Sequence, residues 1–303
     1  MMDITNLLNL QGEMFLLLLI GAILRKRKIL PEEAKTVLTD LVIYLVLPCN
    51  IVNSFRVVFD TNYIRDFLII LIVAGGIQVF CMILSRILYN KESHDRKKVL
   101  QYATLVSNAG FMGNPIAEGV FGATGLMYAS IYLIPQRIVM WSAGVACFTE
   151  AGSKKELVKK VLTHPCIVAV YIGFFFMLTQ CPLPEFVGDT IKMVGSGTTF
   201  LSMLLIGTIF ADIRWKDLVS IPVINYTILR LILIPMATYI VCRLAGVPSL
   251  ITGVSVLLAG MPAGSTTALL ASKYDGDYIF ATKCVLFSTL MTMVTIPLWC
   301  LVL

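Results

Sequence analysis

The chain alternates between long apolar stretches and short polar connections. Most of the stretches approach the length of about 20 residues that a helix needs to cross a bilayer. They are near-continuous runs of Leu, Ile, Val, Phe and Met, without the strict alternation that is typical of a membrane β-barrel strand. The pattern predicts an all-α membrane protein with ten transmembrane helices, at 7–25, 36–55, 66–86, 99–119, 124–148, 164–180, 191–211, 218–243, 249–272 and 278–301.

Composition supports this interpretation. Of the 303 residues, 58% are hydrophobic and only 14% are charged, and the mean hydropathy is +0.87. Such a chain has too few polar residues to cover the surface of a soluble domain. The longest connections have only about a dozen residues, too few for a second domain. Function is therefore expected inside the helical bundle.

The positive charges predict the orientation. Alternate connections hold 17 of the 24 Lys and Arg residues, whereas the other connections hold only Arg56, Arg65, Lys192 and Arg243. Basic connections face the cytoplasm, so both chain ends are predicted to be extracytoplasmic. Residues 1–24 lack the basic start of a cleavable signal peptide, so the first stretch is expected to remain as a helix. Topology and anionic lipid explain the net positive charge, and no nucleic-acid partner is expected.

Cysteine and histidine spacing predicts neither a metal site nor a cofactor. The eight cysteines show no CxxC or Cys/His spacing and are interpreted as small apolar packing residues. His94 and His164 lie beside basic connections and are interpreted as interfacial residues rather than ligands. An intramembrane enzyme would need a constellation such as HExxH, so the protein is not expected to be an enzyme.

Ten stretches divide into two halves, 1–152 and 153–303, and an odd number of helices in each half inverts the second half. Gly113-Asn114-Pro115 in the fourth stretch is matched by Gly260-Met261-Pro262 in the ninth, 147 positions later. One such segment alone would be attributed to close helix packing. Two at matching places predict interrupted helices, because proline removes a backbone donor and clashes with the preceding turn.

The interruptions predict an anion site at the middle of the membrane. We expect the first half-helices to end near Gly110 and Gly260 and the second to begin near Pro115 and Pro262. Each new N-terminus exposes unpaired N–H groups and partial positive charge. Neutral donors and small residues flank these N-termini. The flanking residues that complete the predicted site are Asn108, Gly113, Asn114, Ala263, Ser265, Thr266 and Thr267.

Charged side chains inside apolar stretches are costly and usually face a cavity or a partner. Arg137, after Pro135 and Gln136, is predicted to attract an anion, because a guanidinium can bind a carboxylate with two hydrogen bonds. A structural ion pair or snorkelling is the alternative, and for Arg230 and Lys283 it is given equal weight.

For several polar side chains near the ends of the stretches, the sequence allows two different roles. Glu118 and Asp40 are interpreted as boundary residues that reach water, with proton transport as the alternative. Asn50 lies near Pro48 and Asn53 on one helical face, which either lines the cavity or bonds to another helix.

The segments "SNAGFMGNP", "AGMPAGSTTALLASKY" and "TIPLW" together resemble the auxin efflux carrier family, in its bacterial form, over essentially the whole chain. The resemblance implies the five-plus-five inverted repeat of the bile/arsenite/riboflavin transporter superfamily. It also implies a scaffold of helices 1, 2, 6 and 7 and a core of helices 3, 4, 5, 8, 9 and 10 that moves as an elevator. Asn108, Asn114, Pro115, Met261 and Pro262 would lie at the substrate site.

By this resemblance the protein is expected to be a secondary transporter of small organic anions, such as dicarboxylates or auxin-like acids, in a bacterial inner membrane. A homodimer through the scaffold is also expected. The connection 149–163 is short and basic, unlike the long loop of plant members. Residues 259–272 contain no Asp, Glu, Asn or Gln, which favours proton coupling or uncoupled flow over sodium. A cation/proton antiporter is the alternative, although it usually needs acidic residues at mid-membrane. A channel is a further alternative.

Overall fold

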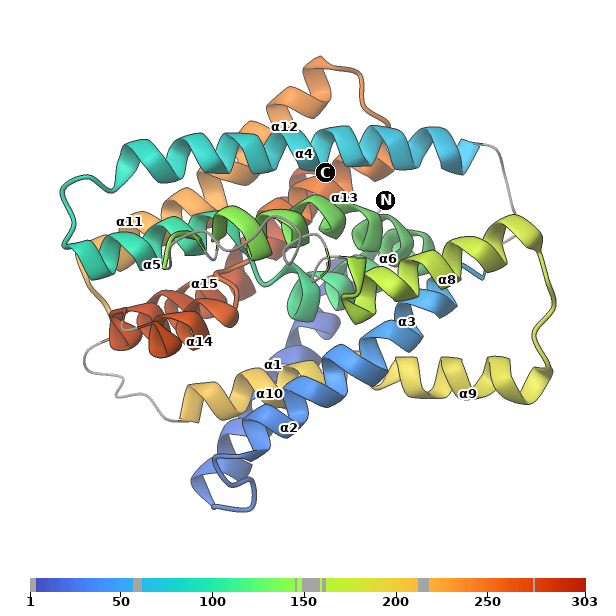
Figure 1. Cartoon of the computed structure of the whole chain (residues 1–303), viewed down its shortest axis with the longest axis horizontal. Helices are drawn as coiled ribbons and strands as arrows, with labels where there is room; N and C mark the ends of the chain where they lie inside the picture. The colour runs from blue at the N-terminus through green and yellow to red at the C-terminus, as the bar shows by residue number, and fades with distance from the viewer. Residues whose placement is uncertain are drawn as a thin grey trace.

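A computed structural model describes residues 4–56, 62–144, 146–148, 159, 162–211, 218–274 and 276–303. Regular structure in these ranges is helical (Figure 1), and the label η marks short π-helical segments. The elements are α1 (Ile4–Lys26), α2 (Ala34–Leu41), η1 (Val42–Val46), α3 (Leu47–Ser54), α4 (Asn62–Leu88), α5 (His94–Leu105), η2 (Ala109–Gly113), α6 (Asn114–Val139), η3 (Met140–Gly144), α8 (Pro165–Thr179), α9 (Glu185–Ser196), α10 (Thr198–Ala211), α11 (Ile221–Ile228), η5 (Leu229–Leu233), α12 (Ile234–Leu244), α13 (Ser249–Ala259), α14 (Thr266–Lys273) and α15 (Tyr278–Val302).

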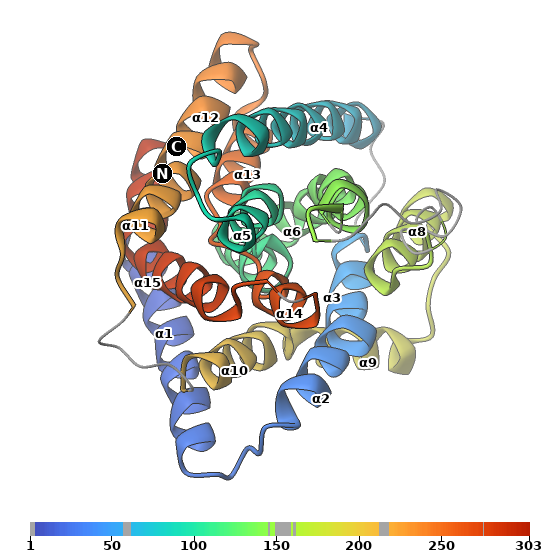
Figure 2. The same cartoon turned by 60° about the vertical axis from the view of Figure 1, so that its left-hand side comes forward.

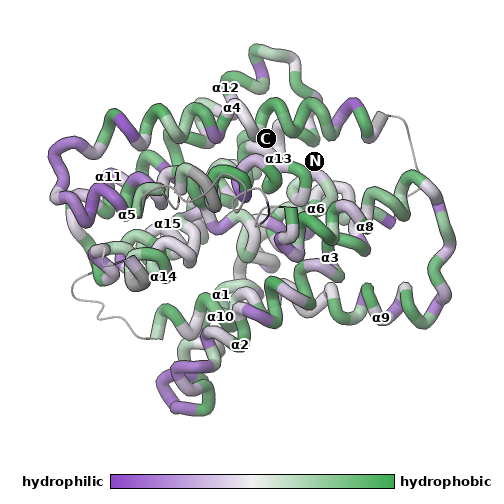
Figure 3. Tube along the Cα trace, in the orientation of Figure 1, coloured by the Kyte–Doolittle hydropathy of each residue, from purple (hydrophilic) through white to green (hydrophobic). Residues whose placement is uncertain are grey.

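The helices are those of a multi-pass membrane protein. Within the described ranges, six helical segments are long and apolar enough to cross a bilayer: Ala34–Ser54, Tyr63–Leu88, Ala109–Val139, Glu185–Ala211, Ile221–Leu244 and Tyr278–Val302. α8 and α13 are apolar but shorter. Hydrophilic residues gather at connections such as those between α1 and α2 and between α4 and α5 (Figure 3). The all-helical membrane class is confirmed, whereas the count of ten spans stays a prediction.

The helices pack as two groups (Figure 2). In the first group, α1 packs along α10, and α3 packs against both α8 and α9. Small residues allow the closest of these approaches, as is common between membrane helices. A Cβ added to Gly207 on α10 would lie 2.1 Å from the carbonyl oxygen of Leu18 on α1, and one on Gly21 would lie 2.3 Å from that of Leu204. Only glycine fits at either position.

The second group contains α4–α6 and α11–α15. α6 packs against α4 and α13, and α15 packs against α11 and α14. Within α6 the backbone leaves the helix at Gly122, where φ is 68° and ψ is −161°. A φ in this region favours glycine because it lacks a Cβ. The turn separates the second half of the expected fourth span from the expected fifth span.

Both glycine- and proline-rich stretches are interrupted, as predicted. α5 ends at Leu105, residues 106–108 leave the helix, and η2 then continues into α6. α13 ends at Ala259, and α14 begins at Thr266. Ser107 and Ala263 form an antiparallel bridge between the two interruptions. The Asn108 N–H donates to the Pro262 carbonyl at 2.8 Å, and the Gly264 N–H donates to the Val106 carbonyl at 3.1 Å. The two unwound segments therefore satisfy each other's backbone groups, as membrane depth requires.

One predicted boundary within these stretches is confirmed, because α13 ends at Ala259, next to Gly260, but the other three are wrong, and α5 ends at Leu105 rather than near Gly110. The second half-helices begin at Ala109 and Thr266, not at Pro115 and Pro262. Pro115 is accommodated in the first turn of α6, directly after the π-helical turn of η2 has shifted the hydrogen-bond register. The residues that pair across the bridge are 156 positions apart, whereas Pro115 and Pro262 are 147 apart, and the match between the two prolines stays a prediction.

Candidate functional site

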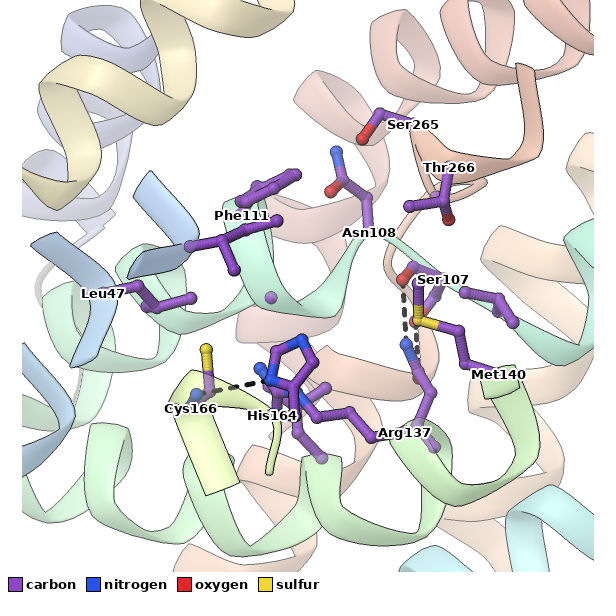
Figure 4. A pocket seen from close by; sticks show the side chains of 16 residues that line it. Leu47, Ser107, Asn108, Phe111, Arg137, Met140, His164, Cys166, Ser265 and Thr266 are labelled. Carbon is purple, nitrogen blue, oxygen red and sulfur yellow. Dashed lines mark hydrogen bonds between the residues drawn. The ribbon is translucent and has the colours of Figure 1, made fainter. Parts of the chain in front are cut away.

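A cavity of about 80 Å³ lies where the two groups meet, next to the paired interruptions (Figure 4). Its volume has room for several water molecules. The lining comes from five places: η1 and α3, the two interruptions, the end of α6 with η3, and the start of α8. The lining residues are Ile43, Leu47, Val106, Ser107, Asn108, Gly110, Phe111, Leu133, Gln136, Arg137, Met140, His164, Cys166, Gly264, Ser265 and Thr266.

The structure brings five of the predicted site residues together at this cavity: Asn108, Gln136, Arg137, Ser265 and Thr266. They come from α6 and from both interruptions, which are far apart in the sequence. The fold therefore assembles polar groups from both halves of the chain in one place. The remaining predicted residues lie in the walls of the crossing or farther away.

Neighbouring side chains brace the unwound segments. Gln136 donates to the Ser107 carbonyl at 2.9 Å, and the Ser107 hydroxyl donates back to the Gln136 amide oxygen at 3.0 Å. The Tyr102 hydroxyl donates to the Thr266 hydroxyl at 3.0 Å. The first of these bonds satisfies a backbone carbonyl of the interruption, and the other two join side chains around it. Gln136 is thus engaged in holding the first interruption, although it also lines the cavity.

Arg230 stabilises the ends of the helices that lead into the crossing. Its side chain is only 2% exposed. Nε donates to the Met261 carbonyl at 3.0 Å, and Nη1 donates to the Thr104 carbonyl at 3.0 Å. The C-terminal carbonyls of a helix lack intrahelical partners and carry partial negative charge, so a guanidinium there is favourable. Of the two roles left open for Arg230, the structural one fits these contacts.

Arg137 is also buried, although slightly less than Arg230, and it is less well partnered. It is 7% exposed, and its Nη1 has no hydrogen-bond partner among the described residues. The guanidinium lies beside His164 and Cys166. Its Nη2 is 3.9 Å from the place that a Cβ on Gly110 would occupy. At the edge of the first interruption, Arg137 therefore has a donor, Nη1, for which the described residues provide no acceptor.

Two helix N-termini reach the same cavity. Asn108 is the N-cap residue of η2 and Ser265 that of α14, and neither makes a side-chain capping bond. The Asn108 amide nitrogen is also buried and has no partner within the described ranges. Uncapped N-termini carry partial positive charge. Among the described residues that line the cavity there is no Asp or Glu to balance this charge or that of Arg137.

The other predicted site residues build the crossing itself. The carbonyls of Met261 and Pro262 accept the bonds from Arg230 and Asn108 described above, and Ala263 donates its N–H to the Ser288 hydroxyl at 3.1 Å. Gly113 packs so closely on α13 that an added Cβ would lie 2.6 Å from a methyl group of Leu258.

Asn114, which precedes Pro115, is completely buried, and neither atom of its amide has a partner in the described part of the chain. A direct role of Asn114 in substrate binding stays a prediction.

Asn50 lies apart from the cavity lining and bonds to an acid. Its amide nitrogen donates to Glu118 at 3.0 Å, which links α3 of the first group to α6 of the second. Glu118 is half-buried, whereas Asp40 on α2 is exposed. Of the two roles left open for Asn50, the structure shows a bond to another helix.

His164 lines the cavity beside Arg137, which the sequence pattern did not predict. Its place at a membrane interface stays a prediction. It is also the N-cap of α8, where its Nδ1 accepts the N–H of Cys166 at 3.3 Å. The sequence "HPC" before an apolar run signals a helix start, but nothing in it places that start at the cavity. Phe111 and Met140 were missed for the same reason.

Comparison with known proteins gives a consistent result. A family model described as "Membrane transport protein" matches residues 12–300. An uncharacterized transporter of Methanothermobacter thermautotrophicus is 26% identical over 291 residues, which cover 95% of each chain. An uncharacterized transporter of Methanocaldococcus jannaschii is 24% identical over 294 residues, 94% of each chain. The chain belongs to the membrane transport protein family, which is the auxin efflux carrier family that its two interrupted segments resemble.

Proposed function

We propose that the protein is a secondary transporter of small organic anions, with the substrate held in the cavity beside Arg137. The observation that carries the proposal is the Nη1 of a buried guanidinium, which has no hydrogen-bond partner in the described part of the chain. Leaving a buried charged donor unsatisfied is costly, and the partial positive charge of the two helix N-termini that line the same cavity adds to that cost. A carboxylate in the cavity would relieve both costs.

The packing supports alternating access. The first group contains the expected spans 1, 2, 6 and 7, and the second contains spans 3, 4, 5, 8, 9 and 10. We assign them as scaffold and core, respectively. The cavity lies on their border, so a movement of the core would change which side of the membrane it faces. A scaffold-mediated homodimer and a cytoplasmic side at the basic connections belong to the same proposal.

The inverted repeat has support of its own. In a five-plus-five repeat, spans 1 and 2 are equivalent to spans 6 and 7. The packing of α1 (span 1) on α10 (span 7) is then equivalent to that of α8 (span 6) on α3 (span 2), and both pairs pack extensively. The bridge between Ser107 and Ala263 lies where an axis relating the two halves would pass. α1 begins and α15 ends near each other in two views (Figures 1 and 2), which is compatible with both ends on one side of the membrane and so with an even number of crossings.

The contact between Glu118 and Asn50 provides a test of proton coupling. It joins the two groups, so it would break when the core moves. Glu118→Gln keeps an acceptor for Asn50 but cannot exchange a proton. If Glu118 carries the coupled proton, uptake by this variant loses its dependence on a pH gradient. An unchanged dependence removes Glu118 from the mechanism and leaves uncoupled flow or another carrier.

Binding and transport by the purified protein test the function directly. Thermal unfolding is followed with acetate, benzoate, succinate and sodium, and uptake of the stabilising acid is then measured in proteoliposomes. We expect stabilisation by a carboxylate and saturable uptake that is stimulated by substrate on the opposite side. Arg137→Ala should abolish both. Stabilisation by cations alone would overturn the proposal in favour of a cation/proton antiporter, and non-saturable flux would indicate a channel.

A further inference from the structure

His164 joins the start of α8 to the cavity. The Cys166 N–H donates to its Nδ1, and the other ring nitrogen points away from that bond, toward the inside of the cavity (Figure 4). Arg137 lies beside the ring. The two side chains come from different groups of helices, His164 from the first and Arg137 from the second.

The capping bond determines which nitrogen carries the proton. A backbone N–H can donate only to a lone pair, so Nδ1 is unprotonated in this geometry. The neutral ring then carries its proton on Nε2. A proton on Nδ1 would break the cap and place a second cation beside Arg137, at a helix N-terminus where positive charge is unfavourable. His164 is therefore held as a neutral donor.

We propose that His164 donates Nε2–H to the anion bound at Arg137. This inference rests on the proposed function and adds a binding residue to it. A carboxylate has two oxygens, so one can accept from the free Nη1 of Arg137 and the other from His164. The anion would then contact both groups of helices at once. Movement of the core would separate Arg137 from His164 and remove one of the two contacts, which lowers affinity in the state that releases substrate.

One substitution separates this role from capping. In His164→Asn the shorter amide still accepts the Cys166 N–H, since Asn is among the strongest N-cap residues, but it does not extend to the position of Nε2. We expect about tenfold or greater loss of affinity for the carboxylate that stabilises the wild type best among acetate, benzoate and succinate. Unfolding of the ligand-free variant should be unchanged. His94→Asn, at the exposed start of α5, is the matched control and should bind as the wild type does.

Nitrogen NMR of the full-length protein tests the same inference without relying on a variant's stability. The chain has only two histidines, so ring-labelled His164 is assigned with His94→Asn. We expect the Nε2–H form, with an Nε2 resonance that moves when the same carboxylate is added and does not move in Arg137→Ala.

The possible results distinguish the two proposals. Wild-type protein that no carboxylate stabilises contradicts the proposed function. Arg137-dependent binding that His164→Asn leaves unchanged, an Nδ1–H form, or an Nε2 signal that does not respond overturns only the role of His164.

Discussion

Two buried arginines at the crossing have opposite surroundings. Arg230 donates to the Thr104 and Met261 carbonyls, next to helix C-termini. Arg137 lies near the N-termini of η2 and α14 and keeps an Nη1 without a partner in the described chain. The first guanidinium meets partial negative charge and the second meets partial positive charge.

The comparison shows that burial alone does not separate a structural charge from a functional one. Both arginines are more than nine-tenths buried, and both carry the cost of a charge at membrane depth. What differs is whether the protein supplies the acceptors. Arg230 is compensated by the fold, whereas the described residues offer Nη1 of Arg137 no acceptor, and this difference is the basis for proposing an anionic ligand.

The largest expected effect is on folding. Arg230→Met leaves two buried carbonyls without donors, at a cost of about 1–3 kcal/mol each. We expect a large drop in the thermal unfolding midpoint of detergent-purified protein. Arg243→Met, at an exposed position near the end of the same helical segment, should unfold near the wild-type temperature. Equal midpoints for the two variants would mean that the carbonyl contacts of Arg230 do not support the crossing.

Removal of the other arginine should give the reverse result. Arg137→Met is expected to leave the ligand-free protein as stable as the wild type or more stable, because a poorly compensated buried charge is lost. Carboxylate affinity should fall by about 10- to 100-fold or more, since a hydrogen bond to a charged group is removed. Titration calorimetry with the stabilising acid measures this loss.

Arg137→Lys refines that result, because it keeps the charge but loses the planar fork and should bind with intermediate affinity. Binding by Arg137→Met at wild-type strength would place the anion elsewhere.

The smallest effect is expected from Gly110→Ala. The added methyl group would make ordinary van der Waals contact 3.9 Å from Nη2 of Arg137, so folding should tolerate it. It would occupy space beside the guanidinium and weaken carboxylate binding a few-fold. Gly75→Ala on α4, where a Cβ meets nothing within 4 Å, is the control. A larger loss of stability than of affinity would show that Gly110 serves the backbone rather than the cavity.

Sequence patterns located the interruptions but not their boundaries. Pro262 lies within the interruption between α13 and α14, whereas Gly113 and Pro115 lie in the helix that follows the other interruption, at 106–108. They did not predict where each helix breaks, because the break lies where Ser107 can pair with Ala263, and that pairing depends on how the two halves approach each other. A proline limits the hydrogen bonds in the interior of a helix, but it is well accommodated in the first turn of a new helix. Its position alone therefore does not show where a helix breaks.

The sequence by itself determined that the protein lies in a membrane, that it is helical and that two of its segments are unwound. Apolar length and backbone hydrogen bonding decide these features, and both are local properties. It also identified Arg137 and Arg230 as costly charges. Only the tertiary structure decided that Arg230 is paired, that Nη1 of Arg137 has no partner among the described residues and that His164 lines the same cavity. Those outcomes depend on which carbonyls, helix ends and donors meet in space, and residues far apart in the chain supply them.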